Sequence, residues 1–171
     1  MKNICLIGYM GSGKTTVGRL LADALSCDFE DTDEMIVERE GRPISDIFEK
    51  EGEPYFRRLE TDLLNELCDK GLSKTVLSTG GGLPVAERNR PILKKIGKVV
   101  YLRAEAESLY MRVKEDKGRP LLETGDKLKK IREMLAVRGP IYEVTADFII
   151  DTDHIDEEQT VKEIVNILKS S

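Results

Sequence analysis

A glycine-rich stretch near the N-terminus, GYMGSGKT at residues 8–15, carries the side chains best suited to chemistry. It fits the pattern G-x-x-x-x-G-K-[ST], in which glycines permit a sharp turn and let backbone N–H groups approach phosphate oxygens closely. Lys14 would place a positive charge beside the β- and γ-phosphates, and the Thr15 hydroxyl would bind Mg²⁺, which prefers hard oxygen ligands. The nucleotide-binding residues predicted here are Gly11, Ser12, Gly13, Lys14, Thr15 and Thr16.

The segments on either side of this stretch have the patterns that the motif requires. Residues 4–7 are apolar and partly β-branched, which predicts a buried strand. Residues 16–25 place Val17, Leu20 and Leu21 at the spacing of one helix face. The N-terminus of that helix would point its N–H groups at an anion. The alternative is a glycine-rich turn that matches the motif by chance, and such a turn would not need these flanks.

Two aspartates, Asp31 and Asp33, follow the next predicted strand at residues 27–30. Residues two apart in an extended chain point to the same side, so the two carboxylates would repel each other unless a cation neutralised them. Mg²⁺ beside the nucleotide would do so. The alternative is a helix N-cap, with Asp33 or Thr32 capping a helix that begins at Glu34. A cap accounts for one carboxylate but not for two.

Three consecutive glycines, Gly80, Gly81 and Gly82, come directly after a predicted buried strand at residues 75–79. Glycines cost conformational entropy on folding and add no side-chain packing. A loose turn is the alternative, but close approach of the backbone to a ligand explains the run better.

Three arginines are candidates for binding an anionic ligand. Arg57 lies in a predicted helix at residues 54–69, where Glu60 three positions later could make it a simple surface ion pair. Arg119 lies in the polar segment 115–125, whose glycines and proline predict a mobile flap that could deliver a cation to a transferring phosphoryl group. Arg138 stands where Gly139-Pro140 is expected to interrupt a helix at residues 127–138. Arg119 and Arg138 could each also be solvated surface charges.

The composition restricts the class of protein. The chain has 171 residues, which suggests one domain, and a formal net charge of −5 without a long basic run, which argues against a nucleic-acid binder. No apolar run reaches the roughly 18 residues of a membrane span, and the N-terminus does not have the pattern of a signal peptide. Three scattered cysteines indicate reduced thiols in a cytoplasmic protein. A zinc site is not expected, because His154 is the only histidine.

Predicted strands alternate with predicted helices, which is typical of an α/β fold with a parallel sheet covered by helices on both faces. The later strands are expected at residues 99–102 and 148–150. The other predicted helices cover residues 34–40, 46–50 (capped by Ser45), 106–114 and 160–168. Ligands bind such sheets at the carboxyl ends of the strands, where the glycine-rich stretch, the two aspartates and the triple glycine all fall.

Taken together, these motifs closely resemble those of the shikimate kinase family, in the family's order and spacing over nearly the whole chain. The matching segments are the glycine-rich stretch, D-T-D at 31–33, F-R-x-x-E at 56–60, G-G-G at 80–82, R-P-L-L at 119–122 and R-x-P-x-Y at 138–142.

The resemblance implies a three-layer α/β/α P-loop kinase fold with a five-stranded parallel sheet of order 2-3-1-4-5. It implies one domain over residues 1–171, with a substrate-binding segment at 33–60 and a lid at 112–125. The implied reaction is transfer of the ATP γ-phosphoryl group to the 3-hydroxyl of shikimate, in chorismate and aromatic amino-acid biosynthesis. The implied setting is a cytoplasmic monomer that uses Mg²⁺ and binds neither nucleic acid nor membrane.

The resemblance also implies roles for residues at matching positions. Lys14, Asp33 and Arg119 would be catalytic, Thr15 and Asp31 would bind the metal, and Arg112 and Arg119 would join the nucleotide contacts. The residues implied to bind shikimate are Asp33, Arg57, Gly80, Gly81, Gly82 and Arg138. An arginine that family members often carry after the last strand has no counterpart at residues 151–156, where backbone or His154 could contact adenine instead.

Three other functions would fit part of the pattern. Another small-molecule kinase of similar fold, such as gluconate kinase, would have less need of two arginines, although gluconate also carries a carboxylate. A nucleotide switch or assembly ATPase usually has an acid at the end of an apolar strand, whereas the strand at Thr75 ends in glycines. A catalytically silent relative is disfavoured because every motif residue is intact.

Overall fold

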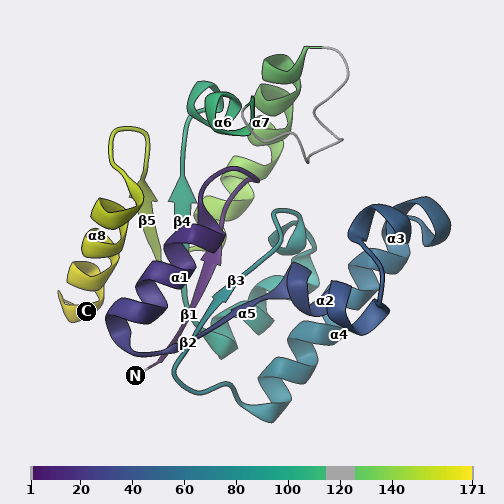
Figure 1. The fold of residues 1–171 in the computed structure, drawn as a ribbon, viewed down its shortest axis with the longest axis horizontal. Coiled ribbons are helices and arrows are strands. Elements are labelled where there is room, and N and C mark those ends of the chain that lie inside the picture. Colours follow the sequence, from purple (N-terminus) through teal and green to yellow (C-terminus); the bar gives the residue numbers. More distant parts are fainter. Residues whose placement is uncertain (1, 115–125, 171) are drawn as a thin grey trace.

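The computed structural model describes residues 2–114 and 126–170 and contains a five-stranded parallel sheet (Figure 1). Its strand order is β2-β3-β1-β4-β5, which confirms the expected order 2-3-1-4-5. The strands are β1 (Asn3–Ile7), β2 (Asp28–Asp31), β3 (Thr75–Ser78), β4 (Gly97–Arg103) and β5 (Phe148–Asp151).

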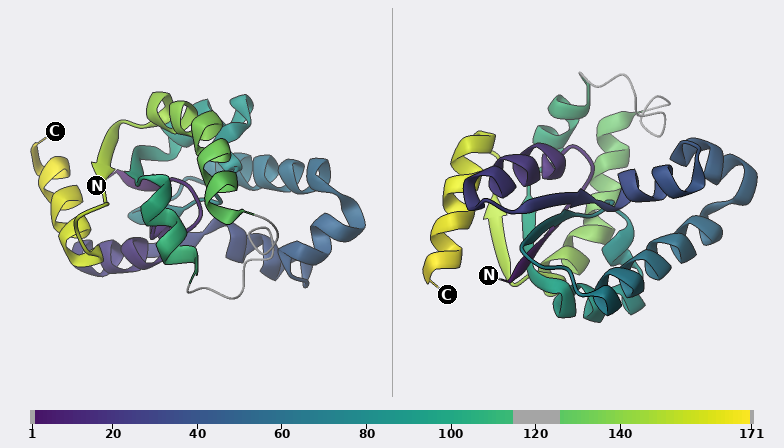
Figure 2. Two further views of the ribbon diagram at one scale, coloured as in Figure 1. Left: turned by 90° about the horizontal axis from the view of Figure 1, so that it is seen from above. Right: turned by 60° about the horizontal axis from the view of Figure 1, so that its bottom comes forward.

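The central strand β1 divides the hydrophobic core by its alternation. Ile4 and Leu6 face the layer formed by α1 (Lys14–Leu25) and α8 (Glu157–Ser170), whereas Cys5 and Ile7 face the opposite layer. That second layer holds α4 (Glu53–Lys70), α5 (Arg90–Ile96) and α7 (Lys127–Thr145). The two layers lie on opposite sides of the sheet when the molecule is seen from above (Figure 2). Burial on both faces explains why the central strand β1 is an almost continuous apolar run.

The sheet register brings the predicted functional segments to one edge. Asp31 pairs with Ser78 and Leu6 with Ser78, so β2, β3 and β1 all end at the same level. The glycine-rich stretch leaves β1 there, Asp31 ends β2, and the triple glycine follows β3. The helix α6 (Ala106–Lys114) leads away from β4 at the same edge and begins and ends where the sequence predicts.

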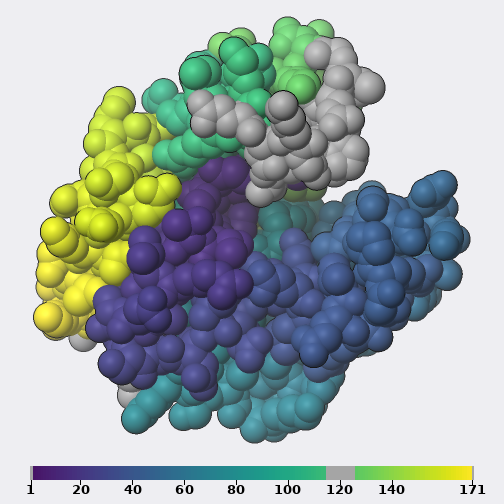
Figure 3. All heavy atoms as spheres, in the orientation of Figure 1, coloured from purple at the N-terminus to yellow at the C-terminus, as the bar shows by residue number. Residues whose placement is uncertain are grey.

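A helical segment stands to one side of this edge. It consists of α2 (Thr32–Glu40), α3 (Ile44–Glu51) and the first half of α4. Ile47 is fully buried inside it, and the rings of Phe48 and Phe56 lie 4.9 Å apart. Figure 3 shows this segment in blue, separated from α8 in yellow by the purple α1. The expectation that Ser45 caps the helix predicted at residues 46–50 is wrong, because α3 begins at Ile44, so Ser45 lies inside it, and α3 has no side-chain cap hydrogen bond.

The helix α7 does not stop at Arg138 but continues through Gly139-Pro140 to Thr145, which corrects the sequence prediction. Proline removes one helical hydrogen bond and normally kinks or ends a helix. Here the residues beyond it are held in place, since Tyr142 is fully buried against Tyr101 and Thr145 donates to the Ile141 carbonyl. Tertiary packing therefore outweighs the local cost.

The remaining differences are short helical elements that were not predicted and one shifted helix start. The short helix α5 was not predicted, yet its Leu93 and Ile96 are buried. Two 3₁₀ turns, η1 (Leu83–Val85) and η2 (Glu87–Asn89), precede it. Helix α8 begins one turn before the predicted start at Thr160. None of the helices in the described ranges is long and apolar enough to cross a membrane.

Candidate active site

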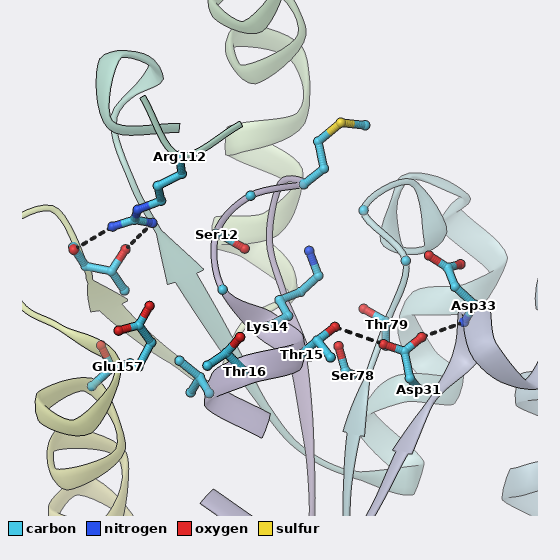
Figure 4. A pocket seen from close by; sticks show the side chains of 18 of the residues that line it. Ser12, Lys14, Thr15, Thr16, Asp31, Asp33, Ser78, Thr79, Arg112 and Glu157 are labelled. Carbon is cyan, nitrogen blue, oxygen red and sulfur yellow. Dashed lines mark hydrogen bonds between the residues drawn. The ribbon is translucent and has the colours of Figure 1, made fainter. Parts of the chain in front are cut away.

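A cavity of about 320 Å³ opens at the carboxyl edge of the sheet and is shown in Figure 4. The glycine-rich stretch and α1 form its floor, the ends of β2 and β3 form one side, and α6 with the start of α8 form the other. Most of the residues expected to bind nucleotide, metal or shikimate line it. They are Gly11, Ser12, Gly13, Lys14, Thr15, Thr16, Asp31, Asp33, Gly80, Gly81 and Arg112.

The glycine-rich stretch has the backbone geometry of a phosphate loop. Gly8, Gly11 and Gly13 have positive φ angles of 152°, 83° and 91°, which side chains with a Cβ rarely adopt. Lys14 Nζ donates to the carbonyl oxygens of Gly8 and Tyr9, at 2.7 and 3.1 Å. The ammonium is thus held over the loop, where it can exchange backbone oxygens for phosphate oxygens.

Ser12 supplies an independent sign that the loop binds an anion. Its hydroxyl oxygen is buried, and among the described residues it has no hydrogen-bond partner. A buried polar atom without a partner costs free energy, so such atoms normally find one. A phosphate oxygen in the cavity would fill that role.

The predicted metal ligands Thr15 and Asp31 lie together. The Thr15 hydroxyl donates to Oδ2 of Asp31 at 3.2 Å (Figure 4). This oxygen pair beside a phosphate loop is the donor set that Mg²⁺ uses when phosphates and water complete its shell. The described residues contain no cluster of three or more acidic, histidine or cysteine ligands, so phosphate and water would have to supply the remaining positions.

Asp31 and Asp33 do not point to the same side, which corrects the sequence prediction. Asp31 is extended, but α2 begins at Thr32, so Asp33 already lies in its first helical turn. Asp31 caps α2 by accepting from the N–H groups of Asp33 and Glu34 with Oδ1, at 2.9 and 3.2 Å. Its other oxygen faces Thr15. The carboxylate of Asp33 instead points toward the triple glycine, as Figure 4 shows.

The triple glycine makes room for two side chains, at Gly80 and Gly82, and lies in contact with a third at Gly81. A Cβ at Gly80 would lie 2.7 Å from Oδ1 of Asp33, and one at Gly82 would lie 2.5 Å from the Arg57 guanidinium nitrogens. A Cβ at Gly81 would lie 3.7 Å from a guanidinium nitrogen of Arg138. The sequence predicted that this backbone lies close to a ligand. In the structure it lies close to the predicted substrate-binding side chains, which come from three separate helices.

Arg57 also makes the ion pair that its spacing suggests, but the pair is not a simple surface contact. Its guanidinium donates to Glu60 at 2.7 Å and to the exposed Glu53 at 3.2 Å. Glu60 is fully buried, and burial raises its pKa to about 7, although Arg57 opposes that rise. Its second carboxylate oxygen has no partner among the described residues. These acidic contacts hold the guanidinium against the glycine segment.

The far end of the cavity is closed by Arg112, which donates to the hydroxyl and carbonyl oxygens of Thr152 at 3.3 and 2.9 Å. Thr152 and Ile155 line this end, whereas His154 lines a different cavity. Of the two contacts left open, a backbone contact at residues 152–155 therefore fits better than His154. Arg119 and most of the predicted lid at 112–125 lie outside the described residues.

Sequence reasoning missed two buried residues that hold the site. Thr32 accepts a hydrogen bond from the Gly80 N–H at 3.0 Å, and Tyr142 donates one to the Gly81 carbonyl at 2.6 Å. Both residues belong to motifs that were recognised, D-T-D and R-x-P-x-Y. Their partners are far away in the chain, so no local spacing signals the contacts.

A model of the shikimate kinase family matches residues 10–169. The chain is 44% identical over 165 residues to a shikimate kinase of Pseudomonas syringae pv. tomato, covering 96% of this chain and 95% of that protein. It is 47% identical over 156 residues to a shikimate kinase of Neisseria meningitidis, covering 89% and 91% of the two chains.

Solved structures give the same result. A shikimate kinase from Acinetobacter baumannii in complex with shikimate superposes with a TM-score of 0.92 at 42% identity, covering 99% of this chain and 94% of that chain. A gluconokinase from Sinorhizobium meliloti superposes with a TM-score of 0.59 at 18% identity, which shows a shared fold and no more.

Proposed function

Because the chain belongs to the shikimate kinase family, we propose that it transfers the γ-phosphoryl group of ATP to the 3-hydroxyl of shikimate. The products are shikimate 3-phosphate and ADP, on the route to chorismate and the aromatic amino acids. One structural observation carries the assignment of the acceptor: Asp33, Arg138 and Arg57 converge on Gly80, Gly81 and Gly82, beside the phosphate loop. The two guanidinium groups suit the carboxylate of a small ligand, and the carboxylate of Asp33 suits its hydroxyl groups.

On the nucleotide side, the chain's own groups bind and neutralise phosphate. The N–H groups of residues 11–16 and the Ser12 hydroxyl surround the phosphate oxygens, and Lys14 balances their charge. Phosphoryl transfer makes little demand on covalent chemistry, so positioning and charge neutralisation account for most of the acceleration. Arg112, held by Thr152, lies against the adenine end of the cavity.

On the acceptor side, Arg57 and Arg138 bind the shikimate carboxylate. Three of the five Arg57 N–H groups donate to Glu53 and Glu60, which leaves one N–H group on each terminal nitrogen for the oxygens of a carboxylate. Asp33 accepts a hydrogen bond from the 3-hydroxyl, orients its oxygen toward the γ-phosphorus and takes its proton. The glycines keep this space open.

Further parts of the proposal concern the cofactor and the state of the protein. Thr15 and Asp31 would hold Mg²⁺, which would neutralise the charge that develops on the phosphate oxygens. The enzyme would act as a cytoplasmic monomer, with residues 33–60 as substrate-binding segment. The prediction that Arg119 adds a cation from a lid concerns residues outside the described part of the chain and stays a prediction.

The test is transfer of phosphate from labelled ATP with shikimate, with gluconate and with no acceptor. We expect turnover with shikimate alone. Preferential phosphorylation of gluconate would show that the chain is a different small-molecule kinase of the same fold. ATP hydrolysis without an acceptor and unchanged by shikimate would favour a nucleotide switch or assembly ATPase. Binding of both ligands with no turnover would identify a silent relative.

A further inference from the structure

We infer that Tyr142 is a positioning residue for shikimate, because its hydroxyl fixes the backbone of the triple glycine and its helix holds Arg138 beside it. The inference rests on the proposed function and adds Tyr142 to the residues that prepare the shikimate site, although Tyr142 is not one of the proposed shikimate ligands. Its basis is a hydrogen bond of 2.6 Å from the Tyr142 hydroxyl to the Gly81 carbonyl oxygen, between segments far apart in the sequence.

The hydrogen bonds of the glycine segment show what Tyr142 adds. The Gly80 N–H donates to Thr32, and the carbonyl oxygens of Gly80 and Gly82 accept from Leu83 and Val85. Tyr142 holds the one carbonyl between them. Among the described residues, the N–H groups of Gly81 and Gly82 donate to no protein acceptor. The carbonyl oxygens are thus bound to protein, while N–H groups beside the cavity are left for a ligand.

A tether of this kind matters more at glycine than elsewhere. A peptide between two glycines meets little steric resistance to rotation, so its orientation depends on its hydrogen bonds. Fixing the Gly81 carbonyl fixes the direction of the Gly82 N–H on the other side of the same peptide plane. It also fixes the backbone against which Arg57 and Arg138 lie. Preorganised donors bind more tightly because less ordering remains to be done on binding.

The continuity of α7 joins this tether to Arg138. Residues four apart lie on the same face of a helix, so Arg138 and Tyr142 face the glycine segment together. A break at Gly139-Pro140 would have separated them. The Arg138 guanidinium is close enough to oppose the rise in the pKa of Tyr142, which burial nevertheless raises to about 12. Tyr142 therefore remains a protonated donor throughout the physiological range.

A purely structural role is the competing explanation, because Tyr142 is fully buried and packs on Tyr101 with ring centroids 5.0 Å apart. The two explanations differ in what the hydroxyl does. Packing needs only the ring, whereas positioning of the glycine segment needs the oxygen.

The experiment compares Tyr142→Phe with Tyr101→Phe. Both variants keep a buried ring and lose a hydroxyl, but Tyr101 lines a separate cavity with Arg103 and His154. For Tyr142→Phe we expect the shikimate KM, and the shikimate Kd measured without nucleotide, to rise about fivefold, the effect of one lost hydrogen bond. The KM for ATP should stay unchanged. Tyr101→Phe should leave all three constants unchanged.

An unchanged shikimate Kd in a folded Tyr142→Phe protein would overturn the inference, as would equal rises in both KM values. If the unaltered enzyme did not phosphorylate shikimate at all, the proposed function would be refuted instead, so the two failures are distinguishable. If Tyr142→Phe does not fold, difluorotyrosine at position 142 keeps the ring and the hydroxyl but ionises at lower pH.

In that protein, shikimate affinity should fall between pH 7 and 10 while that of the unaltered enzyme does not, since a phenolate cannot donate to Gly81. The charged and titratable groups that face Tyr142 are Arg138, Arg57, Tyr9 and Tyr101, and they are the same in both proteins. An equally flat pH profile in the two proteins would overturn the inference.

Discussion

The two halves of the candidate site, one for the nucleotide and one for the acceptor, are built in opposite ways. The phosphate-binding part of the nucleotide half comes from one continuous stretch, residues 8–16, and its lysine and serine serve the same loop that positions them. The acceptor half has no such stretch. Asp33 comes from α2, Arg57 from α4 and Arg138 from α7, and all three meet on a backbone segment that follows β3.

This difference separates what local sequence can encode from what the fold must supply. The phosphate loop needs only the end of a strand, three glycines and the start of a helix. The acceptor half depends on the register of three strands and on a helix that crosses a proline. We therefore expect changes in the nucleotide half to act on transfer itself, and changes in the acceptor half to act mainly on shikimate.

The largest effect is expected from Lys14→Ala. Removing a cation that balances transferring phosphate should lower kcat by a factor of about 1000, the loss typical of one electrostatic contact to a transition state. If the halves are independent, the shikimate Kd measured without nucleotide should not change. Since Lys14 also holds the Gly8 and Tyr9 carbonyls, a thermal melt must show that the variant is folded. A simultaneous loss of shikimate binding would mean that the halves are coupled.

The two aspartates test where the halves meet. Asp33→Asn should lower kcat by a factor of about 100 or more, because the hydroxyl loses its proton acceptor, and should weaken shikimate binding without nucleotide. Added Mg²⁺ should not restore its activity. Asp31→Asn keeps an oxygen that can accept the α2 cap bonds, so it should fold and lose mainly metal affinity.

A Mg²⁺ titration of both aspartate variants beside the unaltered enzyme gives the answer. Raising Mg²⁺ should recover much of the activity of Asp31→Asn, since a weakened site can be filled by mass action. Equal recovery of both variants, or of neither, would show that the carboxylates act as one shared metal site despite pointing in different directions.

Arg57→Lys sharpens the description of the acceptor half. Lysine keeps the charge but loses the planar fork, so kcat/KM for shikimate should fall by roughly 2–4 kcal/mol, mostly through KM. The KM for ATP should hardly change. A matched control is Arg58→Lys on the same helix, whose guanidinium lies 5.9 Å over the Tyr55 ring, away from Gly82. If Arg57→Lys moved the ATP constant instead, the assignment of Arg57 to the carboxylate would be wrong.

The predictability of the site from sequence follows the same division. The phosphate loop, the strand before it and the helix after it are local patterns, and the structure confirms the loop's glycine geometry. The sheet order was expected only from the family resemblance, because periodicity shows which segments are strands but not which are neighbours. Asp33, Arg57 and Arg138 were likewise assigned by resemblance, and their meeting at the glycines could not be derived from spacing.

The errors also have a common physical cause. The break expected at Gly139-Pro140 reflects the local cost of proline, which burial of Tyr142 outweighs. The same-side orientation expected of Asp31 and Asp33 assumed an extended chain, but the Asp31 side chain itself starts α2. Thr32 and Tyr142 were missed because each acts on a residue from another element.

The smallest effect is expected on stability, from Glu60→Gln in the acceptor half. Burial raises the pKa of Glu60 from 4.5 to about 7. Between these two pH values the folded protein holds a proton on Glu60 that the unfolded chain has released. The contribution of protonated Glu60 to the free energy of unfolding is fully present below pH 4.5 and is lost as the pH rises through about 7. Glutamine does not titrate, and it can still accept a hydrogen bond from Arg57.

Melting temperatures between pH 5 and 8 test this expectation. As the pH rises across this range, the melting temperature of Glu60→Gln should rise relative to that of the unaltered protein. At pH 8 the difference should correspond to a gain on the order of 2 kcal/mol in the free energy of unfolding. Glu53→Gln is the matched control, because Glu53 is the exposed partner of the same arginine and should leave the pH profile of the unaltered protein in place. A parallel profile for Glu60→Gln would mean that Arg57 keeps Glu60 ionised in the folded protein. The acceptor half would then contain a permanent buried ion pair, and the shikimate carboxylate would compete with Glu60 for Arg57 at every pH.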